Sequence, residues 1–198
     1  MFVQIFEGRV FNRGTAHRLI DDWVSALRLR AMGFLGATAG VSDDGRVIAL
    51  LRFESAAAAS GSGYLPERGP YWAELEKVLN GPVAVTDSDD AETFFSGESN
   101  DARFVEIVKA RGVNRAQLRE MDASIQRVAG SWRPDFIGSF RVWTGPDSYV
   151  EADYFTSEAE MRESQQKEPP PEFAGRIGAF QEMMANAEML DIRDPWLY

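Results

Sequence analysis

Two carboxylates near the end of the chain are the strongest candidates for chemistry. Glu151 and Asp153 lie in segment 148–156, whose Val, Tyr and Phe content predicts a strand. Side chains two residues apart on a strand point to the same face. Like charges in a partly buried site raise at least one pKa, which suits a general base. The alternative is a solvated strand face, or ion pairs with arginines.

A second pair of candidates lies on the opposite strand face. Arg52 could hold an anionic substrate or a developing oxyanion, and Tyr154 could donate to a phenol or carbonyl oxygen. Structural pairing, for example of Arg52 with Glu74, is the alternative. Because alternation separates Tyr154 from Glu151, all four candidates converge only if neighbouring strands bring them together.

Four aromatic residues are candidates for a substrate pocket, with core packing as the alternative: Trp72, Trp143, Phe53 and Phe155. We expect no cofactor and no metal. The sequence has no cysteine, and its one histidine, His17, falls on the polar side of a predicted helix. No phosphate-binding loop and no dinucleotide fingerprint is present.

The elements that must position these residues occur twice. A shift of 102 residues aligns Phe2-Val3-Gln4-Ile5 with Phe104-Val105-Glu106-Ile107, and Phe53-Glu54-Ser55 with Phe155-Thr156-Ser157. Over positions 2–57 it gives 11 identities, where unrelated sequences would give about three at a match chance of about 6%. A repeat of this length indicates a duplicated small domain.

Each copy follows the order β-α-β-β-α-β, the ferredoxin-like unit. In the first copy we predict strands at 2–10, 34–41, 46–54 and 83–85, with a helix after Asn12 and another from about Pro70. In the second we predict strands at 104–109, 136–143, 148–156 and 189–192, with a helix after Asn114. The two asparagines are expected as helix caps.

The predicted domains are a first repeat at 1–90, an acidic linker at 91–102 and a second repeat at 103–198. The net charge of −10 and the scattered arginines argue against a nucleic-acid partner and against an anionic membrane. The absence of cysteine and of a signal-type start favours a cytoplasmic protein.

Phe53-Glu54-Ser55 and Tyr154-Phe155-Thr156-Ser157-Glu158, each at the end of a strand and the start of a helix, resemble the antibiotic-biosynthesis-monooxygenase superfamily. That resemblance implies a dimeric α+β barrel, fused here into an intrachain pseudo-dimer, and small-molecule chemistry without a cofactor. Heme-degrading relatives use a histidine after the third strand and an asparagine on the first; this chain has Gln4 or Glu106 on that strand, which disfavours heme degradation.

The function predicted from the sequence is a cofactor-independent monooxygenase or isomerase acting on an aromatic or apolar molecule. Glu151 or Asp153 would withdraw a proton, and Arg52 or Tyr154 would stabilise the oxyanion. The alternative is a non-catalytic binding or stress-response barrel whose interior is filled by side chains. The sequence leaves open whether the fused pair forms a further homodimer.

Overall fold

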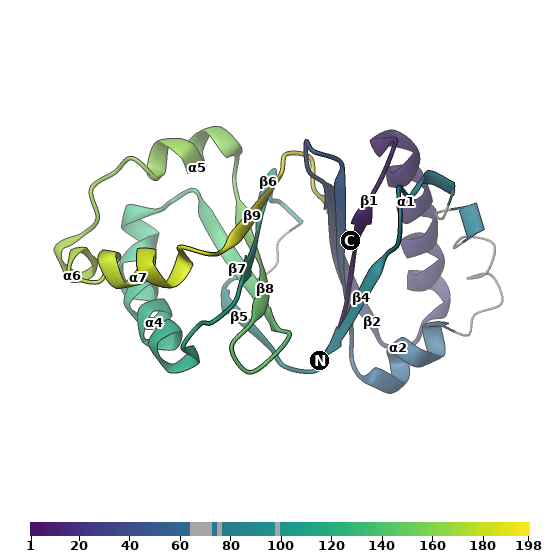
Figure 1. Cartoon of the computed structure of the whole chain (residues 1–198), viewed down its shortest axis with the longest axis horizontal. Helices are drawn as coiled ribbons and strands as arrows, with labels where there is room; N and C mark the ends of the chain where they lie inside the picture. Colours follow the sequence, from purple (N-terminus) through teal and green to yellow (C-terminus); the bar gives the residue numbers. More distant parts are fainter. Residues whose placement is uncertain (64–72, 75–76, 98–99) are drawn as a thin grey trace. The chain divides into compact units, whose positions relative to one another are not determined.

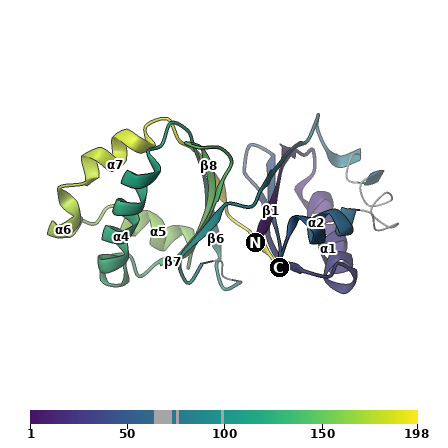
Figure 2. The same ribbon diagram turned by 90° about the horizontal axis from the view of Figure 1, so that it is seen from below.

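The chain folds into two compact units, each a five-stranded antiparallel sheet with helices on one face (Figure 1 and Figure 2). The computed structural model describes residues 1–63, 73–74, 77–97 and 100–198. The first unit contains Met1–Ala91 and Asp194–Tyr198, and the second Glu92–Arg193. The predicted α+β class with tandem ferredoxin-like repeats is confirmed. No helix in the described ranges is long and apolar enough to cross a bilayer.

The first unit contains the sheet β10-β2-β3-β1-β4. Its elements are β1 (Phe2–Arg9), α1 (Arg13–Arg30), β2 (Phe34–Val41), β3 (Arg46–Phe53), α2 (Ala56–Gly63), β4 (Ala84–Ser88) and β10 (Trp196–Leu197). The apolar face of α1 packs on the sheet through Ala16, Ile20 and Val24. Most of the helix expected from Pro70 lies outside the described residues.

The second unit contains the sheet β5-β7-β8-β6-β9. Its elements are β5 (Ala91–Phe95), β6 (Phe104–Ala110), α4 (Arg115–Trp132), β7 (Phe136–Trp143), β8 (Tyr149–Phe155), α5 (Glu158–Ser164), α6 (Pro171–Ala174), α7 (Ile177–Met184) and β9 (Glu188–Ile192). Pro171 at the start of α6 separates α5 from the two later helices, as the proline run predicts.

The 102-residue shift is kept in three dimensions. Helices α1 and α4 begin and end 102 residues apart, and both sheets have a register irregularity at the equivalent places, Phe34/Gly36 and Phe136/Gly138. The predicted caps are confirmed: the Asn12 side chain accepts from Thr15 N, and that of Asn114 from Gln117 N. Any position of one sheet can therefore be compared directly with its counterpart in the other.

The edge strands β5 and β10 depart from the predicted division of the chain. Ala91–Phe95, expected in the linker 91–102, form β5 beside β7, and the C-terminal β10 pairs with β2 of the first unit. Two glycines permit these strands to approach closely. A Cβ on Gly36 would lie 2.5 Å from the Tyr198 carbonyl oxygen, and one on Gly138 would lie 2.6 Å from the Gly97 carbonyl oxygen.

His17 differs from its expected solvent-exposed position. Its ring stacks on Trp196 of β10, with the ring centroids 4.4 Å apart and the planes 3° from parallel. Trp196 is itself buried. The difference arises because α1 packs against a strand that is remote in sequence, which helical spacing alone does not reveal.

Candidate functional site

A polar patch covers the helix-facing side of the second sheet. The register pairs Arg141 on β7 with Glu151 on β8, and Glu106 on β6 with Asp153 on β8. Ser139 also pairs with Asp153. Since strand residues alternate between faces, all five side chains lie on one side of the sheet. Carboxylates and an arginine thus occupy positions that would ordinarily be apolar core.

Arg141 is the centre of this patch. Its guanidinium donates to both Glu151 oxygens at 3.0 Å, and to Asp122 of α4 at 2.7 and 3.2 Å. The Ser139 hydroxyl donates to Glu151 Oε1 at 2.8 Å. The Arg141 guanidinium also lies 4.5 Å from the ring centre of Phe94 on β5. Helix α4, strands β7 and β8 and the edge strand β5 are therefore joined at one cation.

Burial and charge act in opposite directions on this cluster. Burial lowers the pKa of Arg141, but Glu151 and Asp122 raise it, and the net pKa is above the usual range. Burial raises the pKa of Glu151, which Arg141 and Ser139 partly offset. The side chain of Arg141 is only 3% exposed and that of Glu151 7%. Each partner is needed to compensate the charge of the other.

Asp153 differs from its neighbour Glu151. Its carboxyl forms no hydrogen bond and no ion pair with the part of the chain that the structure describes. Burial, reinforced by the charges of Glu151 and Glu106, holds its pKa well above the usual range. Burial and the charge of Asp191 likewise raise the pKa of Glu106. Asp153 is therefore a carboxyl that is inclined to hold a proton and is available to a ligand.

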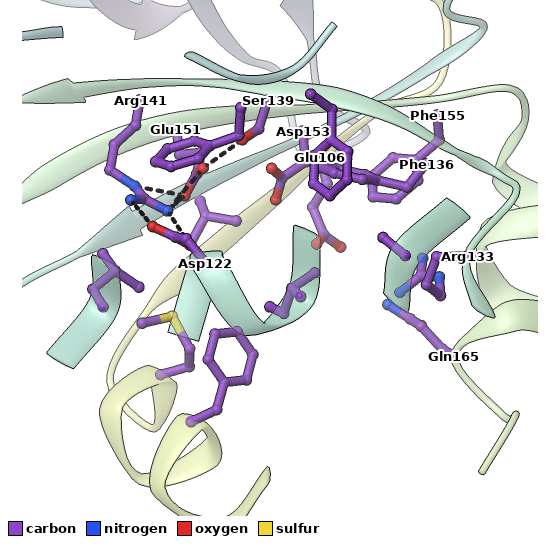
Figure 3. Close-up of a pocket in the computed structure, with 18 of the residues that line it drawn as sticks. Glu106, Asp122, Arg133, Phe136, Ser139, Arg141, Glu151, Asp153, Phe155 and Gln165 are labelled. Carbon is purple, nitrogen blue, oxygen red and sulfur yellow. Dashed lines mark hydrogen bonds and ion pairs between the residues drawn. The ribbon is translucent and has the colours of Figure 1, made fainter. Parts of the chain in front are cut away.

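A cavity of about 270 Å³ separates this patch from the helices. Figure 3 shows the carboxyl groups of Asp153 and Glu106 pointing from the sheet towards α4, beside the Arg141–Glu151–Asp122 network. The rest of the wall is mostly apolar and includes Phe94, Phe95, Phe136, Phe155, Leu118, Ile125, Trp132, Phe173, Phe180 and Met184. A small aromatic molecule would find carboxyl groups and phenylalanine rings together on the sheet, and further apolar side chains on the helices.

The structure brings two of the four predicted catalytic residues together. Glu151 and Asp153 both line the cavity. Tyr154 is fully buried and alternates to the other face of the second sheet. Arg52 belongs to the first unit, where it donates to the Thr38 hydroxyl at 3.0 Å on the sheet face away from α1. Tyr154 and Glu151 thus lie on opposite faces of the second sheet, as strand alternation predicts.

The four predicted pocket residues have separate places. Phe155 lines the cavity. Trp143 is buried in a neighbouring cluster, where its ring packs on Tyr149 and Arg115. Phe53 is in the core of the first unit. Trp72 lies outside the described residues.

Several cavity residues were missed by the sequence reasoning, and one signal could have found them. Asp122, Ser139 and Arg141 are polar residues that stand 102 positions after Ile20, Ala37 and Ala39. The same comparison identified Glu151 and Asp153. Phe94 and Phe95 give no such signal, because they lie in the polar, acidic segment 91–102, whose composition predicts a linker.

The described part of the first unit is apolar at most of the equivalent positions. Ile20, Ala37, Ala39, Ala49 and Leu51, the counterparts of Asp122, Ser139, Arg141, Glu151 and Asp153, all belong to one core cluster, whereas Gln4, the counterpart of Glu106, donates to Asp87. Among the described residues a space of about 30 Å³ lies between Phe6, Trp23 and their neighbours. Two copies of one fold therefore have different interiors, and the cavity described above belongs to the second unit.

A metal site is not indicated. No group of three or more His, Asp or Glu side chains among the described residues is arranged to hold an ion. The only histidine, His17, is in the first unit and stacked on Trp196. The polar patch offers carboxylates to a ligand, with its one arginine already engaged on two sides.

No protein-family model and no curated protein matches the chain. Several solved structures match the chain over nearly its full length. A candidate monooxygenase from Lactobacillus acidophilus NCFM has a TM-score of 0.69 and 10% identity, covering 100% of this chain and 98% of its own. A second candidate monooxygenase, from Fusobacterium nucleatum subsp. nucleatum ATCC 25586, has a TM-score of 0.71 and 12% identity, covering 99% of this chain and 93% of its own. An anthrone oxidase-like protein has a TM-score of 0.64 and 10% identity, covering 99% of this chain and 92% of its own.

These matches run the full length of both partners, so they include both repeats. At this identity they establish the fold and leave the activity to be argued from the site. The resemblance to the antibiotic-biosynthesis-monooxygenase superfamily, drawn above from the strand-to-helix segments, is thereby confirmed for the architecture. The chain has the tandem α+β fold of the monooxygenase-like proteins.

Proposed function

We propose that the second unit binds a small aromatic molecule in its cavity and that Asp153 removes a proton from it, as the first step of a cofactor-independent oxygenation. The observation that carries this proposal is the Asp153 carboxyl, which lines a cavity rich in aromatic side chains and has no hydrogen-bond partner in the described chain. The cavity of about 270 Å³ lies just below the roughly 300 Å³ at which ligand pockets commonly begin. It therefore suits two or three fused rings.

The two carboxylates would have different tasks. Glu151 is held by Arg141 and Ser139, so its oxygens are already engaged. Asp153 is free to accept a proton, and its raised pKa brings it nearer to neutral pH, where general bases work best. The charge of Glu151 helps to raise that pKa. Glu151 is thus a positioning residue, and Asp153 is the proposed catalytic residue.

An anthrone provides a concrete substrate for this chemistry, and one full-length structural match is an anthrone oxidase-like protein. Asp153 would take one proton from the ring methylene and leave a stabilised carbanion. The carbanion passes one electron to O₂, and the two radicals combine to a peroxide anion. Loss of the second methylene hydrogen with cleavage of the O–O bond gives the quinone carbonyl and hydroxide, which Asp153 protonates to water. One anthrone and one O₂ thus become one anthraquinone and one water.

The oxyanion that develops on the ring carbonyl needs a donor. Arg52 and Tyr154 remain predictions for this role, although Tyr154 lies on the far face of its own sheet. Arg141 belongs to the polar patch, but its donors are occupied by Glu151 and Asp122. Substitution of each of the three, measured on the same substrate, decides which one contributes.

Anthrone oxidation provides the test. Oxygen uptake and quinone absorbance are followed with the wild type, Asp153→Asn and the control Glu182→Gln, which changes an exposed carboxylate on α7. We expect the asparagine variant to lose roughly 100-fold or more of the enzymatic rate, the usual contribution of a general base, while the control keeps it. Full turnover by Asp153→Asn would overturn the proposal.

The non-catalytic alternative, a barrel with a side-chain-filled interior, fits the apolar core cluster in the described part of the first unit. It does not describe the second. If the protein purified from its own host carries an aromatic ligand in native mass spectrometry, but oxidises neither that ligand nor an anthrone, a binding role replaces the catalytic one.

A further inference from the structure

The charges around the cavity do not balance. Four carboxyl groups line it, on Glu106, Asp122, Glu151 and Asp153. Arg141 forms ion pairs with Asp122, Glu151 and, at 3.8 Å, Glu92, so its single charge is shared among three carboxylates. The other lining cation, Arg133, is held at 2.7 Å by Asp135, which is outside the lining. The cavity is therefore short of positive charge whenever its carboxyl groups are ionised.

Glu106 and Asp153 form the uncompensated part of this lining. They are direct cross-strand partners on β6 and β8, and Figure 3 shows both carboxyl groups on the cavity side of the sheet. Side chains paired in this way have Cβ atoms about 4.5–5.5 Å apart. The charges of Arg162 and Arg133 both act on Glu106, with Arg162 at 3.8 Å. Each of these arginines binds another carboxylate more closely, Arg162 to Asp191 and Arg133 to Asp135.

The aromatic part of the lining has the complementary property. The rings of Phe94, Phe136, Phe155 and Trp132 line the same cavity. The face of an aromatic ring is negative, and it attracts a cation more strongly where water is excluded. Phe94 already interacts in this way with Arg141. Both the carboxyl groups and the rings therefore favour a positively charged ligand over a neutral or anionic one.

We infer that the ligand of this cavity is an arylalkyl amine, whose protonated aliphatic nitrogen binds between Glu106 and Asp153 while its ring packs against the apolar lining. The inference rests on the site of the proposed function and names its substrate class. A primary ammonium has three donors, enough to satisfy both carboxyl groups at once.

The positive charge would also prepare the base. In the empty cavity, burial and like charge favour protonated Asp153. An ammonium beside it favours the carboxylate, so binding expels a proton and leaves Asp153 ionised. The substrate itself would convert Asp153 into the form that can remove a proton.

Three ligands of similar shape test the inference by isothermal titration calorimetry of the full chain: tryptamine, the neutral tryptophol and the anionic indole-3-acetate. We expect tryptamine to bind roughly tenfold or more tighter than tryptophol, and indole-3-acetate to bind most weakly. Titrations of tryptamine in phosphate and in Tris at neutral pH should give different binding enthalpies. The enthalpy should be more exothermic in Tris, because the buffer takes up the proton that binding releases. Equal affinity for all three, no binding by any, or no proton release with tryptamine would overturn the inference.

The first repeat supplies a matched variant. Glu106→Gln with Asp153→Leu places in the second repeat the residues found at Gln4 and Leu51. The preference for tryptamine over tryptophol should disappear in this double variant and persist in Glu182→Gln. Asp153→Asn alone, which conserves shape, should reduce both the preference and the proton release if the double variant does not fold.

The two proposals fail separately. Preference for tryptamine with proton release, but no oxygen uptake on any substrate, leaves the charge inference standing and removes the oxygenation. Asp153-dependent oxidation of a neutral anthrone, with tryptamine and tryptophol bound equally, leaves the oxygenation standing and removes the charge inference.

Discussion

Arg141 and Glu151 are joined across β7 and β8 by two hydrogen bonds of 3.0 Å, at the register position where the first repeat pairs Ala39 with Ala49. One fold thus accepts either a buried ion pair or two small apolar residues at the same place. That equivalence makes the energetics of the pair measurable within one molecule.

Arg141→Ala should be strongly destabilising, because it leaves Glu151 and Asp122 without their cation. Removal of one partner of a buried ion pair costs about 3–5 kcal/mol. We expect the triple variant Asp122→Ile, Arg141→Ala, Glu151→Ala, which copies the first repeat, to recover a large part of that loss. Urea denaturation of both proteins provides the measurement, and a triple variant no more stable than Arg141→Ala would contradict the expectation.

The raised pKa of Asp153 predicts a pH dependence of stability. Between the unfolded pKa of about 3.9 and the higher folded pKa, the folded protein binds more protons than the unfolded chain. The contribution of Asp153 to the free energy of unfolding therefore falls as pH rises through that window. Asp153→Asn should gain stability relative to the wild type from about pH 4 upwards, by ~1.4 kcal/mol per unit of the shift. Parallel melting curves for the two proteins would show that the folded pKa is ordinary.

Gly138→Ala should displace β5, because the new Cβ would lie 2.6 Å from a backbone oxygen. Overpacking of this kind costs roughly 1–3 kcal/mol, and faster amide exchange should be confined to β5 and its neighbour. Gly130→Ala is the control: it lies on α4 with nothing within 4 Å, so it should stabilise by about 0.5–1 kcal/mol. Similar behaviour of the two variants would refute the close approach.

Trp196→Ala should destabilise the first unit by about 3–5 kcal/mol, since the ring is buried and stacked on His17. Met32→Ala, at a residue 91% exposed, serves as the control and should be nearly neutral. Chemical denaturation measures both. If loss of Trp196 changes stability no more than loss of Met32, the docking of β10 is incorrect.

The strand and helix pattern was predictable because apolar periodicity is a local property and the repeat checks it twice. The two cavity carboxylates were predictable for the same reason: Glu151 and Asp153 stand where the first copy has Ala49 and Leu51. The same comparison, extended to every core position, would also have found Arg141.

Other features depend on contacts between distant segments. The β5 residues lie in an acidic stretch without clear alternation, and their strand forms because β7 presents an open edge. Trp143 was predicted in the pocket, but whether an aromatic residue faces a cavity or the adjacent core depends on the side chains around it. Here Tyr149 and Arg115 enclose it.

The placement of β10 has a consequence for synthesis on the ribosome. The second sheet has all of its strands once β9 has emerged, because β5 precedes the rest of that sheet in the chain. The first sheet must wait for β10, which follows every other described strand in sequence. Domains usually fold in the order in which they are translated. In this protein the sheet that begins first is completed last, and for most of translation the edge of β2 is exposed in the nascent chain.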